Sequence, residues 1–139
     1  MLELYAGCGG ISAACVAQGL RIAVPCEVER GAHFNLLDRR VQQEVLRWLR
    51  AGLVWMVWLG TPCTACSAAR SGAKPPASKQ CVAFTVRVLE ECRLLGLHVA
   101  LESPTTSRLF TVPALRRSLA KFGERGAFIK FHMCGFGAA

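Results

Sequence analysis

The chain has 139 residues, which is enough for one domain and too few for two domains of ordinary size. Hydrophobic residues make up 53% of the chain, which excludes a disordered protein, and no apolar run reaches the roughly 18 residues that a membrane span needs. Lys and Arg number 17 against 9 Asp and Glu, so the net charge is +8. This charge favours a polyanionic partner such as nucleic acid, although an ordinary solvated surface is equally compatible with it.

Eight cysteines are spread along the chain, and several of them lie inside apolar runs. Cysteines in that setting are typical of small buried hydrophobic side chains in a reduced protein, rather than of a disulfide scaffold. The first ten residues place no basic residue ahead of an apolar run, so they do not resemble a secretory signal. We therefore expect an intracellular protein, in the cytoplasm or, in a eukaryote, in the nucleus.

The hydrophobic pattern predicts strands and helices that alternate along the chain. In chain order we expect a strand over 2–6, a glycine turn over 7–10, a helix over 11–18, a strand over 21–28, a brief strand over 33–37, a helix over 39–51, a strand over 53–59, an irregular segment over 60–79, a helix over 80–95, a strand over 97–101, a helix over 113–122 and a last strand over 127–133. Such alternation predicts a single α/β domain over 1–139, with a mainly parallel, doubly wound sheet flanked by helices.

The glycine turn over 7–10 connects the first predicted strand to the first predicted helix. Glycines let a ligand approach the backbone closely, and the start of a helix offers unpaired N–H donors. An acidic side chain at the end of the next strand, Glu27 or Glu29, could accept hydrogen bonds from ribose hydroxyls. The turn therefore favours a nucleotide or nucleoside cofactor, with a tight structural turn as the alternative. It matches neither GxGxxG nor a phosphate-binding loop.

A cysteine follows the strongest predicted strand. Cys63 comes after Pro62, and a partly exposed thiol on such a constrained loop, with a lowered pKa, is suited to act as a nucleophile. A half-buried structural thiol is the alternative. Cys63 also forms a CxxC pair with Cys66. A zinc site would need two further ligands, and a redox pair would need a helix start, which the sequence does not predict there. A glycine-turn nucleotide-binding enzyme with this redox pair remains a third interpretation.

A glutamate ends another apolar strand. Glu102 follows the run over 97–101, and a carboxyl group in a partly dry pocket there would hold or donate a proton near neutral pH. A solvated strand end is the alternative. Because parallel strands end at one edge of a sheet, we expect Glu102, Cys63 and the glycine turn to converge.

Together these strand ends resemble the motifs of one family. The run over 2–10, Leu-Glu-Leu-Tyr-Ala-Gly-Cys-Gly-Gly, resembles the opening cofactor motif of the carbon-5 cytosine-specific DNA methyltransferases. Gly-Thr-Pro-Cys over 60–63, with Ser67 four residues on, resembles their Pro-Cys nucleophile loop, and Leu-Glu-Ser-Pro over 101–104 resembles their Glu-Asn-Val or Glu-Asn-Pro motif. The order and the spacing are similar to the family's, and the resemblance covers about residues 1–104.

The resemblance implies a Rossmann-like, S-adenosylmethionine-dependent methyltransferase fold, and we expect a single catalytic domain over 1–139 that departs from the family in having no target-recognition domain. It implies S-adenosylmethionine as cofactor, DNA as partner, and neither metal nor membrane. Cys63 would add to ring carbon 6 of a flipped-out cytosine, and Glu102 would hold or protonate the neighbouring ring nitrogen. The cofactor pocket would contain Tyr5, Gly7 and Gly9, with Glu27 on the ribose and Asp38 near the adenine. DNA phosphates would meet Arg70, Lys74, Lys79 and Arg108.

The chain also departs from the family's pattern. Thr64 stands where the family has Gln, Ser103 stands where it has Asn, and the later Gln-x-Arg-x-Arg motif does not occur. The link between Glu27 and Asp38 is shorter than the dozen or more residues that a parallel crossover needs. We therefore expect a short, divergent or C-terminally truncated member. It is either a DNA (cytosine-5-)-methyltransferase-like enzyme or, as the alternative, a catalytically silent nucleic-acid-binding domain with a basic surface.

Overall fold

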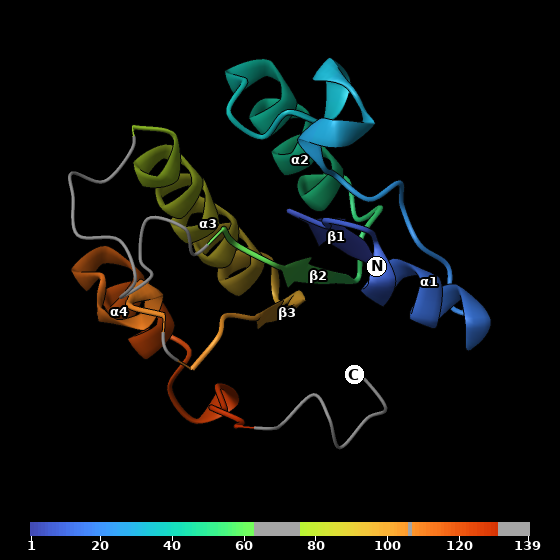
Figure 1. Ribbon diagram of the computed structural model, residues 1–139. Coiled ribbons are helices and arrows are strands. Elements are labelled where there is room, and N and C mark those ends of the chain that lie inside the picture. The colour runs from blue at the N-terminus through green and yellow to red at the C-terminus, as the bar shows by residue number, and fades with distance from the viewer. Residues whose placement is uncertain (63–75, 106, 131–139) are drawn as a thin grey trace.

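A small parallel sheet lies at the centre of the protein. The computed structural model describes residues 1–62, 76–105 and 107–130. The sheet contains β1 (Leu2–Leu4), β2 (Met56–Leu59) and β3 (His98–Leu101), in the spatial order β1-β2-β3 (Figure 1). Its register pairs Leu4 with Leu59 and Leu59 with Leu101, so the three strands end level with one another. The expected α/β class and the parallel sheet are confirmed.

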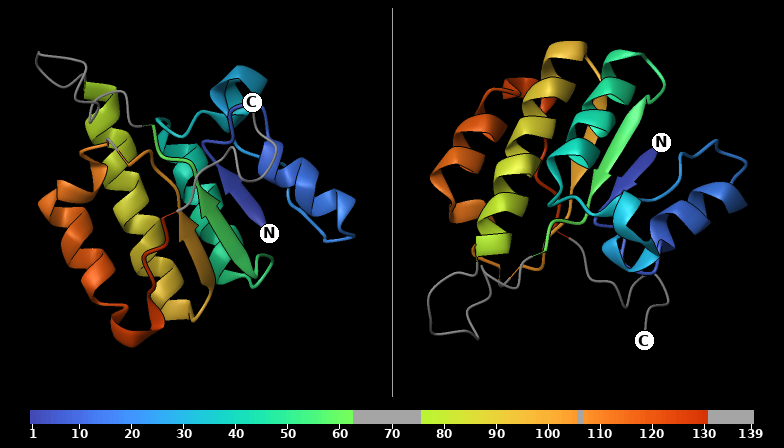
Figure 2. Two further views of the ribbon diagram at one scale, coloured as in Figure 1. Left: turned by 60° about the horizontal axis from the view of Figure 1, so that its bottom comes forward. Right: turned by 90° about the horizontal axis from the view of Figure 1, so that it is seen from above.

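Helices flank this sheet on both sides. They are α1 (Gly10–Ala17), α2 (Arg39–Arg50), α3 (Pro76–Leu95) and α4 (Pro113–Ala120), with short 3-10 helices η1 (Val28–Arg30), η2 (Ala32–Phe34), η3 (Leu109–Thr111) and η4 (Gly123–Arg125). The helices α2 and α3 cover one face, α1 lies on the other side of β1, and α4 packs against α3 (Figures 1 and 2). In the parts of the chain that the structure describes, no helix is long and apolar enough to cross a membrane.

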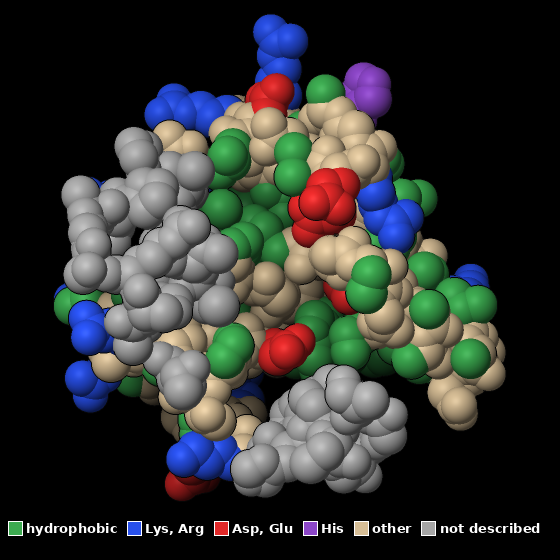
Figure 3. Space-filling view, viewed as in Figure 1, with side chains coloured by type: hydrophobic (Ala, Val, Ile, Leu, Met, Phe, Trp, Pro, Cys, Tyr) green, Lys and Arg blue, Asp and Glu red, His purple; other side chains and the backbone are tan. Residues whose placement is uncertain are grey.

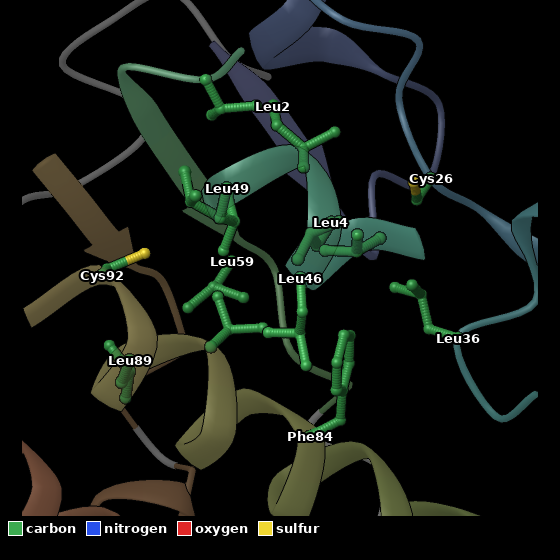
Figure 4. Close-up of a cluster of buried hydrophobic side chains, with 14 of the residues drawn as sticks. Leu2, Leu4, Cys26, Leu36, Leu46, Leu49, Leu59, Phe84, Leu89 and Cys92 are labelled. Carbon is green, nitrogen blue, oxygen red and sulfur yellow. The ribbon is translucent and has the colours of Figure 1, made fainter. Parts of the chain in front are cut away.

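The main core lies between the sheet and the helices α2 and α3. Leu2 and Leu4 are fully buried and belong to the same core cluster as Leu46 and Phe84 (Figure 4). Burying a leucine side chain contributes about 1.5–3 kcal/mol to stability. Since strand side chains alternate between faces, Glu3 points the opposite way, toward α1. The same alternation therefore places two leucines in the core and one carboxylate under the first helix.

The predicted second strand is only partly formed. Ala23 and Cys26 donate backbone hydrogen bonds of 2.8 Å to the carbonyls of Met1 and Glu3. The β-type pairing with β1 is nevertheless limited to an isolated bridge between Leu4 and Cys26. A regular ladder that starts at Ala23 would next require an N–H at Pro25, which proline lacks. Cys26 donates the bond instead, so the segment runs beside β1 without becoming a regular strand.

The brief strand predicted over 33–37 is wrong. The chain instead forms the 3-10 helices η1 and η2, separated by Gly31 at φ 124°, before it reaches α2. Asn35 closes the next turn, because its Oδ1 accepts a hydrogen bond of 3.0 Å from the Leu37 N–H. Two tight turns thus replace the crossover for which the link between Glu27 and Asp38 is too short.

The start of α3 and the last predicted strand also differ from the expectation. The helix α3 begins at Pro76 rather than at residue 80, so it includes part of the segment expected to be irregular. Proline suits the first turn of a helix because the N–H that it lacks would have no partner there. The strand predicted over 127–133 is not found in residues 127–130, and its remaining residues lie outside the described part of the chain.

Candidate functional site

The carboxyl ends of the three strands lie side by side. Gly60, just after β2, donates its N–H to the Leu4 carbonyl at 3.0 Å, and Glu102, just after β3, donates its N–H to the Leu59 carbonyl at 3.0 Å. The arrowheads of all three strands point to this edge, which faces the viewer in Figure 1 (Figure 2). The structure therefore brings the glycine turn close to the points where the Gly-Thr-Pro-Cys and Leu-Glu-Ser-Pro motifs begin. Cys63 and Cys66 lie outside the described residues.

The glycine turn needs its glycines for conformational reasons. Gly7 and Gly9 adopt φ values of 51° and 76°, which side chains rarely tolerate, and the Gly9 N–H bonds to the Ala6 carbonyl at 2.8 Å. A Cβ on Gly9 would lie 2.9 Å from Arg30 Nη2, whereas a Cβ on Gly7 would meet nothing within 4 Å. The turn is therefore structurally tight, and its Gly7 side faces open space in which a ligand could approach the backbone.

Glu27 closes the glycine turn from the neighbouring segment. Its Oε2 accepts a hydrogen bond of 2.9 Å from the Gly7 N–H, and its Oε1 accepts one of 2.8 Å from the Val28 N–H. Each carboxylate oxygen keeps a second lone pair, so Glu27 can also accept a hydrogen bond from a ligand hydroxyl. Of the two acidic residues considered from the sequence, Glu27 contacts the turn, whereas Glu29 is exposed in η1.

The sequence motifs assigned no role to Glu3, although this residue holds the first turn of α1, which follows the glycine turn. Its side chain is only 3% exposed, and its Oε2 accepts a hydrogen bond of 2.8 Å from the Ser12 N–H in the first turn of α1. A carboxylate at a helix N-terminus satisfies an unpaired N–H and balances the positive end of the helix dipole. The signal was present in the sequence as an acidic residue in the middle of an apolar strand.

Tyr5 is not directed into the open space beside the turn. It has a φ of 58°, and its hydroxyl donates a hydrogen bond of 3.1 Å to the Cys81 carbonyl in α3. Burial raises the pKa of the Tyr5 hydroxyl far above its usual range, with a smaller contribution from Cys81. The Tyr5 hydroxyl therefore connects the end of β1 to α3, and the role expected for Tyr5 in a cofactor pocket stays a prediction.

A buried pair of hydroxyls holds the end of β2. Thr61 and Thr85 are 3% and 0% exposed, and their Oγ1 atoms lie 2.8 Å apart. Gly60, just before Thr61, allows β1 and β2 to approach closely, because a Cβ there would lie 2.8 Å from the Tyr5 carbonyl oxygen. These contacts fix the chain immediately before the Pro-Cys dipeptide.

The remaining candidate residues are more exposed. Asp38 caps α2, with its Oδ1 accepting a hydrogen bond of 2.8 Å from the Arg40 N–H, which accounts for an aspartate at this position without a ligand. Glu102 is exposed at the strand end, and the dry pocket considered for it stays a prediction. Of the expected phosphate ligands, Lys79 and Arg108 are exposed, and Arg70 and Lys74 lie outside the described residues.

The carboxyl edge has a distinctive distribution of charge. Figure 3 looks onto this edge and shows acidic side chains around a central hollow with hydrophobic side chains in it, while Lys and Arg lie toward the rim. An acidic centre favours a cationic or neutral ligand, and basic groups at the rim favour an extended polyanion.

Comparison with known proteins assigns no relative to the chain: no family model, curated protein or solved structure matches it. The residues of the carboxyl edge and the resemblance of its three motifs are therefore the basis for a function.

Proposed function

We propose that the chain is a methyltransferase-like domain of the carbon-5 cytosine type, which binds S-adenosylmethionine and transfers its methyl group to cytosine in DNA. One observation carries the proposal. The glycine turn, with Glu27 hydrogen-bonded to Gly7, lies at the sheet edge where the Pro-Cys and Glu-Ser-Pro motifs also begin. Ligands of open α/β sheets bind at the carboxyl ends of the strands, which supports a common role for the three motifs.

The chemistry of the edge fits the proposed cofactor in part. Glu27 retains acceptor capacity for a ribose hydroxyl, and Gly7 is exposed with open space beside it. The acidic hollow favours a sulfonium or ammonium cation (Figure 3). Tyr5 and Asp38, in contrast, use the polar atoms described above for contacts within the protein. We therefore assign the cofactor to Glu27, Gly7 and Gly9, and leave Tyr5 and Asp38 with structural roles.

In this proposal the chain's own residues activate the cytosine ring. Cys63 adds as a thiolate to carbon 6, while Glu102 holds a proton at ring nitrogen 3, which takes up the electron pair and makes carbon 5 nucleophilic. S-adenosylmethionine would supply the methyl group that carbon 5 takes up, and its sulfonium would leave as the neutral thioether. Loss of the proton from carbon 5 then expels the thiolate and restores the aromatic ring. Glu102 is exposed in the free protein, and a cytosine extruded from the duplex would displace the water around its carboxyl group.

A second function is favoured by a different observation. Both oxygens of Glu27 and the hydroxyl of Tyr5 already have partners within the protein, and Glu102 is exposed. A chain that keeps the fold without a working cofactor pocket would be a catalytically silent nucleic-acid-binding domain. It would bind DNA in a salt-dependent manner without responding to the cofactor.

Calorimetric titration with S-adenosylmethionine distinguishes the two functions. We expect the wild type to bind and Gly7→Val to lose binding. Gly52→Val is the matched control, because Gly52 also has a positive φ of 69° with nothing near its Cβ position, and it follows α2 at the opposite edge of the sheet. Loss of binding in both variants would indicate general damage. A folded wild type that does not bind the cofactor would contradict the methyltransferase proposal.

Covalent trapping on DNA that contains 5-fluorocytosine tests the chemical step. The fluorine blocks the loss that would release the enzyme, so an active chain should remain attached to the base. We expect Cys63→Ala to abolish the trapped complex, while Cys8→Ala, which removes an exposed thiol from the glycine turn, leaves it intact. Trapping that survives Cys63→Ala would contradict the role proposed for this thiol.

A further inference from the structure

The outer face of α4 carries a feature that the proposed reaction does not use. An open hollow of about 360 Å³ is lined there by Thr111, Pro113, Arg116, Arg117 and Ala120. The four lining residues of α4 recur at helical spacing, so they form a single stripe along the helix. A shallow hollow of this kind suits part of a long ligand better than an enclosed small molecule.

The helix that presents this stripe is held firmly. Leu115 and Ser118 are 0% and 1% exposed on the inner side of α4. Lys121, just after the helix, forms an ion pair of 2.9 Å with Glu90 on α3. Because its inner side is buried, α4 presents Arg116 and Arg117 outward on a fixed support, and both residues are exposed.

The charge around the hollow is strongly positive. Between residues 107 and 126 the chain has five cations, Arg108, Arg116, Arg117, Lys121 and Arg125, against one acid, Glu124. Within the described part of the chain, Lys121 has an acidic partner, and no ion pair is found for Arg108, Arg116 or Arg117. Three exposed guanidinium groups are therefore available to an external anion.

A hydroxyl and a third arginine extend this basic face. The Thr111 Oγ1 donates a hydrogen bond of 2.8 Å to the Arg108 carbonyl, which fixes Thr111 against the turn that carries Arg108. Guanidinium groups form paired hydrogen bonds with phosphate oxygens, and a row of them matches repeated phosphates better than a single carboxylate. In Figure 3, basic side chains lie at the rim of the carboxyl edge on the side where Figure 1 places α4.

We propose that this α4 face, formed by Arg108, Thr111, Arg116 and Arg117, binds the phosphodiester backbone of duplex DNA. The inference rests on the proposed function in one respect, namely that DNA is the substrate. The chain passes from Glu102 at the end of β3 through η3 directly into α4, so DNA held on α4 lies beside the carboxyl edge. The acidic centre would repel the backbone, which leaves the rim as the place where phosphates bind.

Fluorescence anisotropy with a labelled DNA duplex of mixed sequence tests the α4 face. The variant is Arg116→Gln with Arg117→Gln, and the matched control is Arg39→Gln with Arg40→Gln. The control also removes two adjacent exposed arginines from one helix and changes the net charge equally. We expect the α4 variant to bind DNA more weakly. The slope of log K against log salt concentration is negative, and it should become less steep by about two, since each phosphate contact contributes about 0.9. We expect the control to keep the wild-type slope.

Other outcomes would overturn the inference. One is an equal loss of DNA affinity in both double variants, and another is a wild type that does not bind DNA. A third is that Arg116 and Arg117 are needed for binding to anionic vesicles and not for binding to DNA. Circular dichroism on heating verifies that both variants fold. Calorimetry with S-adenosylmethionine separates this inference from the proposed function. If the wild type fails to bind the cofactor while the α4 variant loses DNA affinity, the methyltransferase proposal fails and the DNA-binding face remains.

Discussion

The Gly7 N–H and the Glu27 carboxylate lie 2.9 Å apart, although 20 residues separate them in the sequence. The same carboxylate accepts a bond from the Val28 N–H and so caps η1. One side chain therefore fixes both the glycine turn and the turn that follows Cys26.

Replacement of Glu27 should loosen this arrangement. We expect Glu27→Ala to reduce the free energy of unfolding by about 1 kcal/mol, the usual effect of a lost cap, because two N–H groups lose their acceptor. Urea unfolding measures the change. The exposed neighbour Glu29→Ala serves as the control, and we expect it to have almost no effect. An equal loss in the two variants would mean that the Glu27 bonds contribute nothing specific.

The buried carboxylate of Glu3 should be more sensitive. We expect Glu3→Ala to destabilise the protein by about 2 kcal/mol, because the Ser12 N–H becomes a buried donor without an acceptor. Glu3→Gln keeps an acceptor oxygen and should lose less. Chemical unfolding of the two variants gives the order. A glutamine variant that is less stable than the alanine variant would contradict the capping role.

Gly60 should not tolerate even a methyl group. The Cβ of Gly60→Ala would lie 2.8 Å from the Tyr5 carbonyl oxygen, and overpacking against backbone costs about 1–3 kcal/mol. Gly10→Ala is the control, since its Cβ would lie 3.8 Å from Cys8 Sγ and alanine favours a helix. Thermal unfolding should show a lower Tm for Gly60→Ala alone. Equal Tm values would mean that the ends of β1 and β2 can separate freely.

Buried thiols should make the fold sensitive to alkaline pH. Burial raises the pKa of Cys26 to about 11 and that of Cys92 to about 12, with the Glu91 charge adding to the effect at Cys92. These groups favour the folded state below the thiol pKa of 9.0 of the unfolded chain, and that contribution is lost as the pH rises through the folded-state values. The free energy of unfolding, measured in urea, should therefore fall above about pH 9. In Cys26→Ala the fall should be smaller. A wild-type stability that stays constant up to pH 11 would contradict this account.

Much of the framework could be predicted from the sequence because its signals are local. The apolar run of β2 and the helical spacing of Val45, Leu46 and Leu49 identify the elements that they form. The glycine turn was recognisable because glycine alone tolerates its backbone angles easily. Parallel pairing then determines that the strand ends share one edge, which made the convergence of the motifs predictable.

Other features depend on interactions that the hydrophobic pattern does not encode. Pro25 interrupts a ladder that the apolar run suggested, because the missing N–H matters only once the partner strand is known. The direction of Tyr5 depends on its positive φ and on a carbonyl 76 residues away. The exposure of Glu102 depends on what packs around the end of β3, which its position in the sequence does not determine.

The buried charge of Glu3 has a consequence for the selectivity of the site. In many α/β proteins the first helix after the first strand attracts a diphosphate with its positive end. Here the Glu3 carboxylate, 2.8 Å from the Ser12 N–H, already compensates that end from inside the protein. A dinucleotide or a nucleoside triphosphate would bring further negative charge against it. If the turn binds a nucleoside as we propose, the Glu3 charge would disfavour a phosphorylated nucleotide at the start of α1 and would favour a nucleoside with a neutral or cationic substituent there.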